Sequence, residues 1–168
     1  MVTEIRSITR IQLNPKPFLV NIKELADKIH ELMQNLNYDT DEESHKFEQG
    51  ATPEEVKDLE IRISGYKAID NYSKFKIETS IVMVRGKKEK IKVGNKTKDV
   101  FRGDGKITIL PVLILDYDNK WEKDPYLHFL KNIYERFLYF STRKALAAKL
   151  FAEATSVKDD IKDFLNME

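Results

Sequence analysis

The chain has 168 residues, of which 41% are apolar and 34% are charged, and its net charge is +1 at pH 7. This length and apolar content predict a single globular domain over residues 1–168, and the balanced charge favours no class of partner. The absence of cysteine excludes disulfides, thiolate metal sites and thiol nucleophiles. No apolar run approaches the ~20 residues that cross a bilayer, and the N-terminus lacks the apolar segment of a signal peptide. We therefore expect a cytoplasmic protein without a membrane span.

The first third of the chain predicts a strand, a helix and a loop. Polar and apolar residues alternate from Thr3 to Leu13, which is typical of a strand, and two prolines end it. Asn21 and Glu24 have the spacing of a capping box before an apolar stripe at helical intervals. Residues 37–52 are polar and irregular, which predicts an acidic mobile loop. Thr52-Pro53-Glu54-Glu55 resembles the start of a further helix.

The middle of the chain predicts most of a β-sheet. Apolar and polar residues alternate around Ile61 and Ile77, as in strands with one covered face. Gly94-Asn95 indicates a two-residue hairpin turn. The stretch Ile107 to Tyr117 is almost wholly apolar, so both of its faces are expected to be covered. Pro111 within that stretch predicts a bulge or an edge position, because proline has no N–H for a sheet ladder.

The last 45 residues predict helices. Asp124-Pro125 is typical of a cap followed by a helix start, and the stripe of Leu130, Ile133 and Phe137 is expected to pack on the sheet. The order of elements predicts an α+β fold. Its antiparallel sheet of about five or six strands would pack against one N-terminal helix and two long C-terminal helices.

Charge is unevenly distributed along the chain. Residues 39–60 contain nine acids and two lysines, a net charge of −7, whereas residues 84–107 contain nine basic residues and three acids, a net charge of +6. These two segments could meet within one molecule or between molecules that associate head to tail.

The basic segment has two interpretations. Lysines that alternate with apolar residues are typical of a strand with one solvated face, and lysines protect sheet edges from aggregation. The same charges could bind phosphates or an anionic surface. The Arg102-Gly103-Asp104 triplet is interpreted as a turn between strands rather than an adhesion motif. The candidate anion-binding residues, in a hairpin over residues 85–106, are Arg85, Lys87, Lys88, Lys90, Lys92, Lys96 and Lys98.

The sequence contains little that resembles catalytic chemistry. Asp116, Asp118 and Glu122 are weak metal candidates, because closely spaced carboxylates suit a hard cation, but they do not match the EF-hand pattern. The three histidines are isolated, and no nucleophile or cofactor motif is present. We therefore expect a protein that is not an enzyme and has no cofactor.

The aromatic content of the C-terminal region is its most distinctive feature. Eight aromatic residues lie between Trp121 and Phe151, more than one helix face can hold. The surplus predicts a protein partner, a ligand cavity or a second helix. The candidate partner-binding residues are Trp121, Tyr126, Phe129, Tyr134, Tyr139 and Phe140.

Three stretches of the chain resemble an uncharacterised group of small archaeal proteins. They are GYKAIDNYSKFKI (residues 65–77), DYDNKWEKDPYLHFLKNIYERF (116–137) and IKDFLN (161–166). In that group an acidic turn with Lys-Trp-Glu precedes an aromatic helix that starts at proline, and a second helix ends near the C-terminus. The resemblance implies an archaeal, thermophilic origin and brings no functional residue with it.

Three functions follow from these patterns. The first is a non-catalytic interaction or assembly protein that self-associates through the aromatic C-terminal helices and the complementary charged segments. The second is a helix-grip-type binder of an apolar ligand, in which a curved antiparallel sheet wraps the C-terminal helix around an apolar cavity. The third is a nucleic-acid-binding protein that uses the Lys-rich hairpin.

Overall fold

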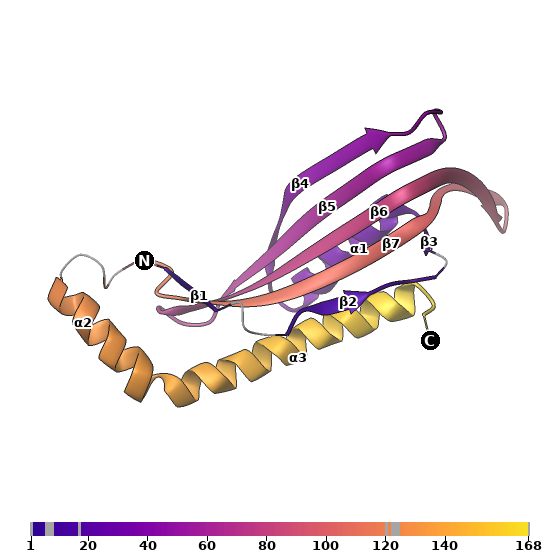
Figure 1. Ribbon diagram of the computed structural model, residues 1–168. Helices are drawn as coiled ribbons and strands as arrows, with labels where there is room; N and C mark the ends of the chain where they lie inside the picture. The colour runs from indigo at the N-terminus through magenta and orange to yellow at the C-terminus, as the bar shows by residue number, and fades with distance from the viewer. Residues whose placement is uncertain (1, 6–8, 17, 120, 122–124, 168) are drawn as a thin grey trace.

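A computed structural model of the protein describes residues 2–5, 9–16, 18–119, 121 and 125–167. The strands and helices are largely segregated along the chain, as in an α+β fold, and the long strands lie in the middle of the chain (Figure 1). In chain order, the elements are β1 (Thr3–Ile5), β2 (Ile11–Leu13), β3 (Phe18–Val20), α1 (Ile22–Asn35), β4 (Asp39–Gln49), β5 (Glu55–Ala68), β6 (Ser73–Val93), β7 (Lys96–Leu115), α2 (Pro125–Ile133), a π-helix η1 (Tyr134–Leu138) and α3 (Phe140–Phe164).

The sheet is antiparallel, as predicted. Strands β4, β5, β6 and β7 form a meander, and β1, β2 and β3 pair one after another along the other side of β7. The described residues form seven strands, more than the five or six predicted, because the N-terminal segment is divided into short pieces. Pro111 lies opposite Ile77 of β6 in an unbroken register, and it falls between the segments of β7 that pair with β1 and with β2. Its expected edge position stays a prediction.

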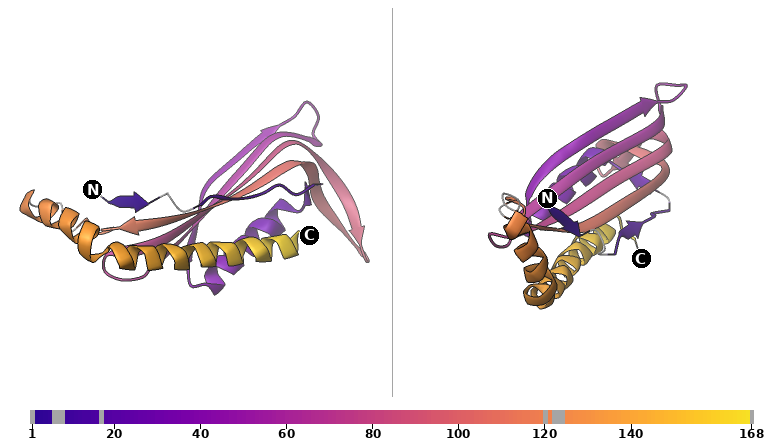
Figure 2. Two further views of the ribbon diagram at one scale, coloured as in Figure 1. Left: turned by 60° about the horizontal axis from the view of Figure 1, so that its bottom comes forward. Right: turned by 60° about the vertical axis from the view of Figure 1, so that its left-hand side comes forward.

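Helices α1 and α3 lie on the same face of the curved sheet (Figure 2). The start of α1 is as predicted, because the Asn21 side chain accepts a hydrogen bond from the backbone N–H of Glu24 at 3.1 Å. The core lies between these helices and the inward-facing residues of the strands. Its largest fully buried side chains include Phe18, Leu25, Ile29, Met33, Ile63, Phe75, Ile77, Ile81, Met83, Ile107, Ile109 and Leu113.

The prediction of a mobile loop over residues 37–52 is wrong for most of that range. Strand β4 pairs with β5 in an antiparallel ladder that includes Thr40 opposite Gly65 and Phe47 opposite Leu59. Its polar composition is compatible with an edge strand, because one side is solvated and cross-strand pairs such as Lys46–Asp58, at 3.1 Å, can form. The helix predicted at Thr52 is also absent, since a turn there leads directly into β5.

The hairpin between β6 and β7 has the predicted two-residue turn. Val93 pairs with Lys96, and Gly94 has a φ of 61°, which glycine adopts without steric cost. The Arg102-Gly103-Asp104 triplet lies within β7 opposite a bulge in β6, not in a turn as predicted. A Cβ atom on Gly103 would lie 2.8 Å from the Cα atom of Gly86, so glycine there reflects the close approach of the strands.

Gly105 provides a test of core packing. A Cβ atom at this position would lie 2.2 Å from the Phe18 ring. We expect Gly105→Ala to lower the free energy of unfolding by about 1–3 kcal/mol, because the core has no room for the added methyl group. Urea unfolding measures this change, and the loss should be smaller when Phe18→Leu makes space. An equal loss in both backgrounds would contradict the contact.

The predicted pair of long C-terminal helices is only partly present. Helix α3 has 25 residues and packs on the sheet through Leu150, Ala154, Val157 and Ile161, but α2 has only nine residues. Figure 1 shows α2 projecting from the end of the sheet. The wide π-helical turn between α2 and α3 shifts the helical register. The prediction that Phe137 packs on the sheet is wrong, since this residue is 70% exposed.

Candidate interaction surfaces

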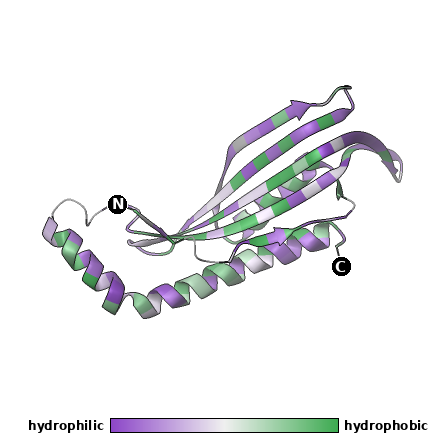
Figure 3. Ribbon diagram, in the orientation of Figure 1, coloured by the Kyte–Doolittle hydropathy of each residue, from purple (hydrophilic) through white to green (hydrophobic). Residues whose placement is uncertain are grey.

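The projecting C-terminal element is the first candidate surface. We call residues 125–140 the arm; they comprise α2, η1, Tyr139 and the first residue of α3. Tyr126, Phe129, Ile133 and Phe137 recur at intervals of three or four residues, so they share one face. Tyr126 and Phe129 are 67% and 60% exposed, and Leu138 beside them is 71% exposed. Figure 3 shows hydrophobic residues along this projecting helix. Exposed apolar clusters of this kind mark interaction sites.

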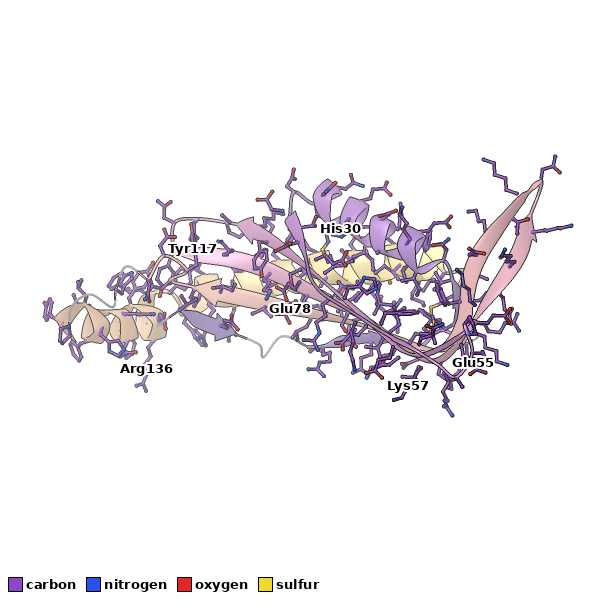
Figure 4. All side chains as sticks on the ribbon, turned by 90° about the horizontal axis from the view of Figure 1, so that it is seen from above. His30, Glu55, Lys57, Glu78, Tyr117 and Arg136 are labelled. Atoms are coloured by element: carbon purple, nitrogen blue, oxygen red, sulfur yellow. The ribbon has the colours of Figure 1, made fainter. Side chains whose placement is uncertain are left out.

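The arm and the first turns of α3 also carry positive charge. From residue 125 to 149, the exposed charged side chains are Arg136, Lys144 and Lys149. Arg136 lies 5.6 Å from the centre of the Phe137 ring and Lys144 lies 4.5 Å from that of Phe140. Figure 4 shows Arg136 pointing away from the arm. The exposed side of the arm and the adjoining turns of α3 are therefore aromatic and basic.

The opposite side of the arm is fixed to the sheet by a buried ion pair. The Nζ atom of Lys131 lies 3.0 Å from the Oδ2 atom of Asp116, and these side chains are only 6% and 2% exposed. Asp116 follows β7 in the left-handed region, with a φ of 52°. Glu135, one turn beyond Lys131, accepts a hydrogen bond from the Tyr72 hydroxyl. These contacts set the direction in which the arm leaves the sheet.

A cluster of aromatic rings adjoins this ion pair through Tyr72, whose backbone carbonyl accepts a hydrogen bond from the Asp116 N–H at 2.7 Å. Trp121 and Tyr134 stack with ring centres 5.7 Å apart, and Tyr72 meets Tyr139 edge to face at 5.2 Å. The Tyr139 hydroxyl also forms a hydrogen bond with Ser73. We call the whole group the anchor cluster; it comprises Tyr72, Ser73, Asp116, Trp121, Lys131, Tyr134, Glu135 and Tyr139.

The predicted partner-binding residues thus fall into two groups. Tyr126, Phe129 and Phe140 are exposed on the arm, whereas Trp121, Tyr134 and Tyr139 belong to the anchor cluster. Sequence reasoning missed Phe137 and Leu138, the most exposed of the large apolar side chains that the structure describes. It missed them because an apolar stripe at helical spacing normally indicates a buried face; only the excess of aromatic residues indicated otherwise.

The anchor cluster predicts an alkaline limit to stability. Burial raises the pKa of Tyr72, and its hydrogen bond to the Glu135 carboxylate raises the pKa further. A raised pKa contributes stability below the ordinary tyrosine value, near 10, and this contribution is lost as the pH rises above it. As the pH is raised from 8 to about 11, we expect the urea concentration at the unfolding midpoint to fall. The fall should be smaller in Tyr72→Phe. Tyr126→Phe, which changes an exposed tyrosine, is the control. Equal pH dependence in all three proteins would contradict this assignment.

The structure describes two of the three candidate metal ligands, Asp116 and Asp118. Asp116 is engaged with Lys131, Asp118 is exposed, and Glu122 lies outside the described residues, as does the predicted cap Asp124. In the part of the chain that the structure describes, no three His, Asp or Glu side chains form a group that could hold a metal ion.

An apolar groove lies between α1 and strands β4 and β5, and it forms the second candidate surface. Its volume is about 690 Å³. His30, labelled on α1 in Figure 4, lines it and forms a 2.9 Å hydrogen bond with Thr40. A separate space of about 650 Å³ lies beside Phe140, and its other lining residues are Asn132, Glu135, Arg136 and Arg143. An apolar ligand would therefore fit under α1 better than beside the C-terminal helix. The apolar side chains that line the groove are Ile22, Ala26, Phe47, Leu59, Ile61 and Phe101.

The third candidate surface is the basic hairpin. We call residues 85–104 the basic ribbon; Figure 4 shows it projecting at the end of the molecule opposite the arm. Glu55 pairs with Lys87 across β5 and β6, so the acidic and basic segments meet within one chain at the base of the ribbon. Of the predicted anion-binding residues, Arg85, Lys88 and Lys98 have ion-pair partners. Among the described residues, Lys87, Lys90, Lys92 and Lys96 are exposed and form no ion pair.

These features define an α+β protein with an aromatic arm, an apolar groove and a basic ribbon. Over the residues described, no helix has the length and apolar character needed to cross a membrane. No protein-family model matches the chain, and comparisons with curated proteins and with solved structures find no similar protein. The resemblance to small archaeal proteins therefore stays a prediction.

Proposed function

We propose that this chain is a non-catalytic interaction protein that self-associates through its arm. The observation that carries the proposal is the exposure of Tyr126, Phe129 and Phe137 on one face of a helix whose other face is fixed by a buried ion pair. Covering such a face against a second molecule would remove apolar area from water, at about 25 cal/mol per Å².

The anchor cluster supports this proposal. A helix that only had to be solvated would not require the buried Lys131–Asp116 pair and the stacked rings of Trp121 and Tyr134 to hold it in one direction. A surface that is already ordered loses less conformational entropy when it binds. The cluster therefore prepares the arm for association.

The charges favour a head-to-tail contact. Two arms facing each other would bring Arg136, and Lys144 in the adjoining turn of α3, against like charges. Strand β4 carries five acids and one lysine, and its Phe47 side chain is 53% exposed beside the apolar groove. The aromatic, basic arm of one copy thus complements the acidic β4 side of the next. Such heterologous contacts form rings or open chains.

Light scattering over a range of protein concentrations tests the proposal. The weight-average mass should rise above that of one chain as the concentration rises, and added salt should weaken the rise, because it screens the charges. A mass equal to one chain at every concentration would refute self-association.

The apolar groove favours a second candidate function, the binding of an apolar ligand. Its volume of about 690 Å³ lies within the range of small-molecule sites, and the curved sheet around α1 is similar to a helix-grip arrangement. A fluorescent fatty acid should bind with a stoichiometry of one to one. Ala26→Phe, which would fill the groove, should abolish that binding, and binding that persists in this variant would exclude the groove as its site.

A further inference from the structure

The acids of the basic ribbon are all engaged in ion pairs within the ribbon. Asp104 lies 2.6 Å from Arg85, Glu89 lies 3.3 Å from Arg102, and Asp99 lies 3.6 Å from Lys88. A fourth cation, Lys98, pairs with Glu24 of α1 at 2.8 Å. The four lysines without an ion pair, Lys87, Lys90, Lys92 and Lys96, therefore present positive charge that no acid of the ribbon offsets.

These four lysines are divided between the two faces of the ribbon. The register pairs Lys90 with Asp99 and Lys92 with Thr97, which places both lysines on one face. Lys87 is an odd number of positions from Lys90 and Lys92, so it lies on the other face. Val93 shares the face of Lys87, and Lys96 lies opposite Val93, so Lys96 is on that face too. A flat anionic surface would contact only one of these faces. A groove bounded by two charged strands would contact both.

The base of the ribbon is held in place. The Asn21 side chain donates a hydrogen bond to the backbone carbonyl of Asp99 at 3.0 Å, and the Lys98–Glu24 pair joins the same strand to the start of α1. Beyond this attachment, the two strands continue to the tight turn at Gly94. The result is a two-stranded element that projects from the body (Figure 4). Lys92 and Lys96 lie on its opposite faces, and Lys87 lies at its base, where β6 also pairs with β5.

We propose that the basic ribbon is a binding site for double-stranded DNA, independent of the proposed self-association. The major groove of B-DNA is about 12 Å wide and admits a two-stranded β-ribbon, so lysines on opposite faces reach phosphates on both walls. Lysine contacts to phosphates carry no sequence information, and binding is therefore independent of base sequence. The ribbon's one aromatic residue, Phe101, lines the apolar groove and offers no stacking platform, which favours duplex over single-stranded DNA.

Fluorescence anisotropy with the full chain and a random-sequence DNA duplex tests this site. The binding constant is measured at a series of salt concentrations, with the protein at concentrations where its weight-average mass is that of one chain. Each neutralised phosphate contributes about −0.9 to the slope of log K against log salt, so four lysines predict a slope of about −3.6. No binding at low salt, or binding without salt dependence, would overturn the proposal.

Two double variants test insertion into a groove. Lys90→Gln with Lys92→Gln removes the charges of one face, and Lys87→Gln with Lys96→Gln removes those of the other. Each should reduce the magnitude of the slope by about 1.8, whereas Lys16→Gln with Lys23→Gln, off the ribbon, should leave it unchanged. If only one of the two ribbon variants weakens binding, insertion is refuted.

Two further measurements identify other occupants of the ribbon. Binding to vesicles of anionic lipid without binding to duplex DNA would overturn the proposal in favour of a membrane surface. A changed mass in the ribbon variants, with no DNA binding by the native chain, would assign these lysines to the acidic segment of another copy. Because mass and DNA affinity are read separately, failure of the DNA site leaves self-association through the arm intact.

Discussion

Asp116→Asn should lower the free energy of unfolding by about 3 kcal/mol, because it removes the negative charge that lies 3.0 Å from the buried Lys131 ammonium group. Removing one member of a buried ion pair typically costs about 3–5 kcal/mol. The lower end is expected here, since Glu135 lies 4.0 Å from the same ammonium group. Asparagine tolerates the positive φ of this position, so backbone strain adds little. Urea unfolding measures the change.

A double variant separates the charge from the packing. Replacing Lys131 with Met in the Asp116→Asn background removes the buried positive charge as well and should restore part of the lost stability. Trypsin provides a local readout, because Arg136 lies in the arm: Asp116→Asn should speed cleavage there more than the double variant does. A single variant as stable as the native chain, with unchanged cleavage, would show that the pair does not hold the arm.

Replacing Phe137 and Leu138 together with Ser should weaken self-association at least 100-fold. Both side chains are about 70% exposed, so the change should leave the free energy of unfolding nearly unaltered. Large side chains buried at the centre of an interface each contribute about 2 kcal/mol or more to binding. Sedimentation velocity of the native and substituted chains measures the shift in dissociation constant.

The matched control lies outside the arm. Phe164, at the end of α3, is 36% exposed, and Phe164→Ser removes an aromatic side chain without touching residues 125–140. It should leave association unchanged. If the native chain self-associates and the double variant Phe137→Ser with Leu138→Ser associates as strongly, the arm is not the contact surface.

The parts of the fold that local patterns determine could be predicted. The capping interaction of Asn21 with Glu24, the turn at Gly94 and the alternation around Ile77 each depend on a few neighbouring residues. Strand β4 could not be predicted, because its own residues have a low preference for strands. The ladder with β5, from Asp39 opposite Tyr66 to Gln49 opposite Val56, makes it a strand.

The candidate surfaces were predictable in kind but not in detail. The surplus of aromatic residues indicated a partner, yet the exposure of Phe137 depends on a π-helical turn and on the Lys131–Asp116 pair, whose members are 15 residues apart. Likewise, the basic composition of the ribbon was evident. Which of its lysines form ion pairs depends on the register of β6 against β7 and on the distant Glu24.

Hydroxyl-radical footprinting at low and high protein concentration tests most directly whether the arm is the association surface. At a concentration where the mass exceeds one chain, Tyr126, Phe129 and Phe137 should be protected from labelling compared with the dilute sample. Phe164 should be labelled equally in both. Equal labelling of the three arm residues in the two samples, while the mass rises, would contradict self-association through the arm.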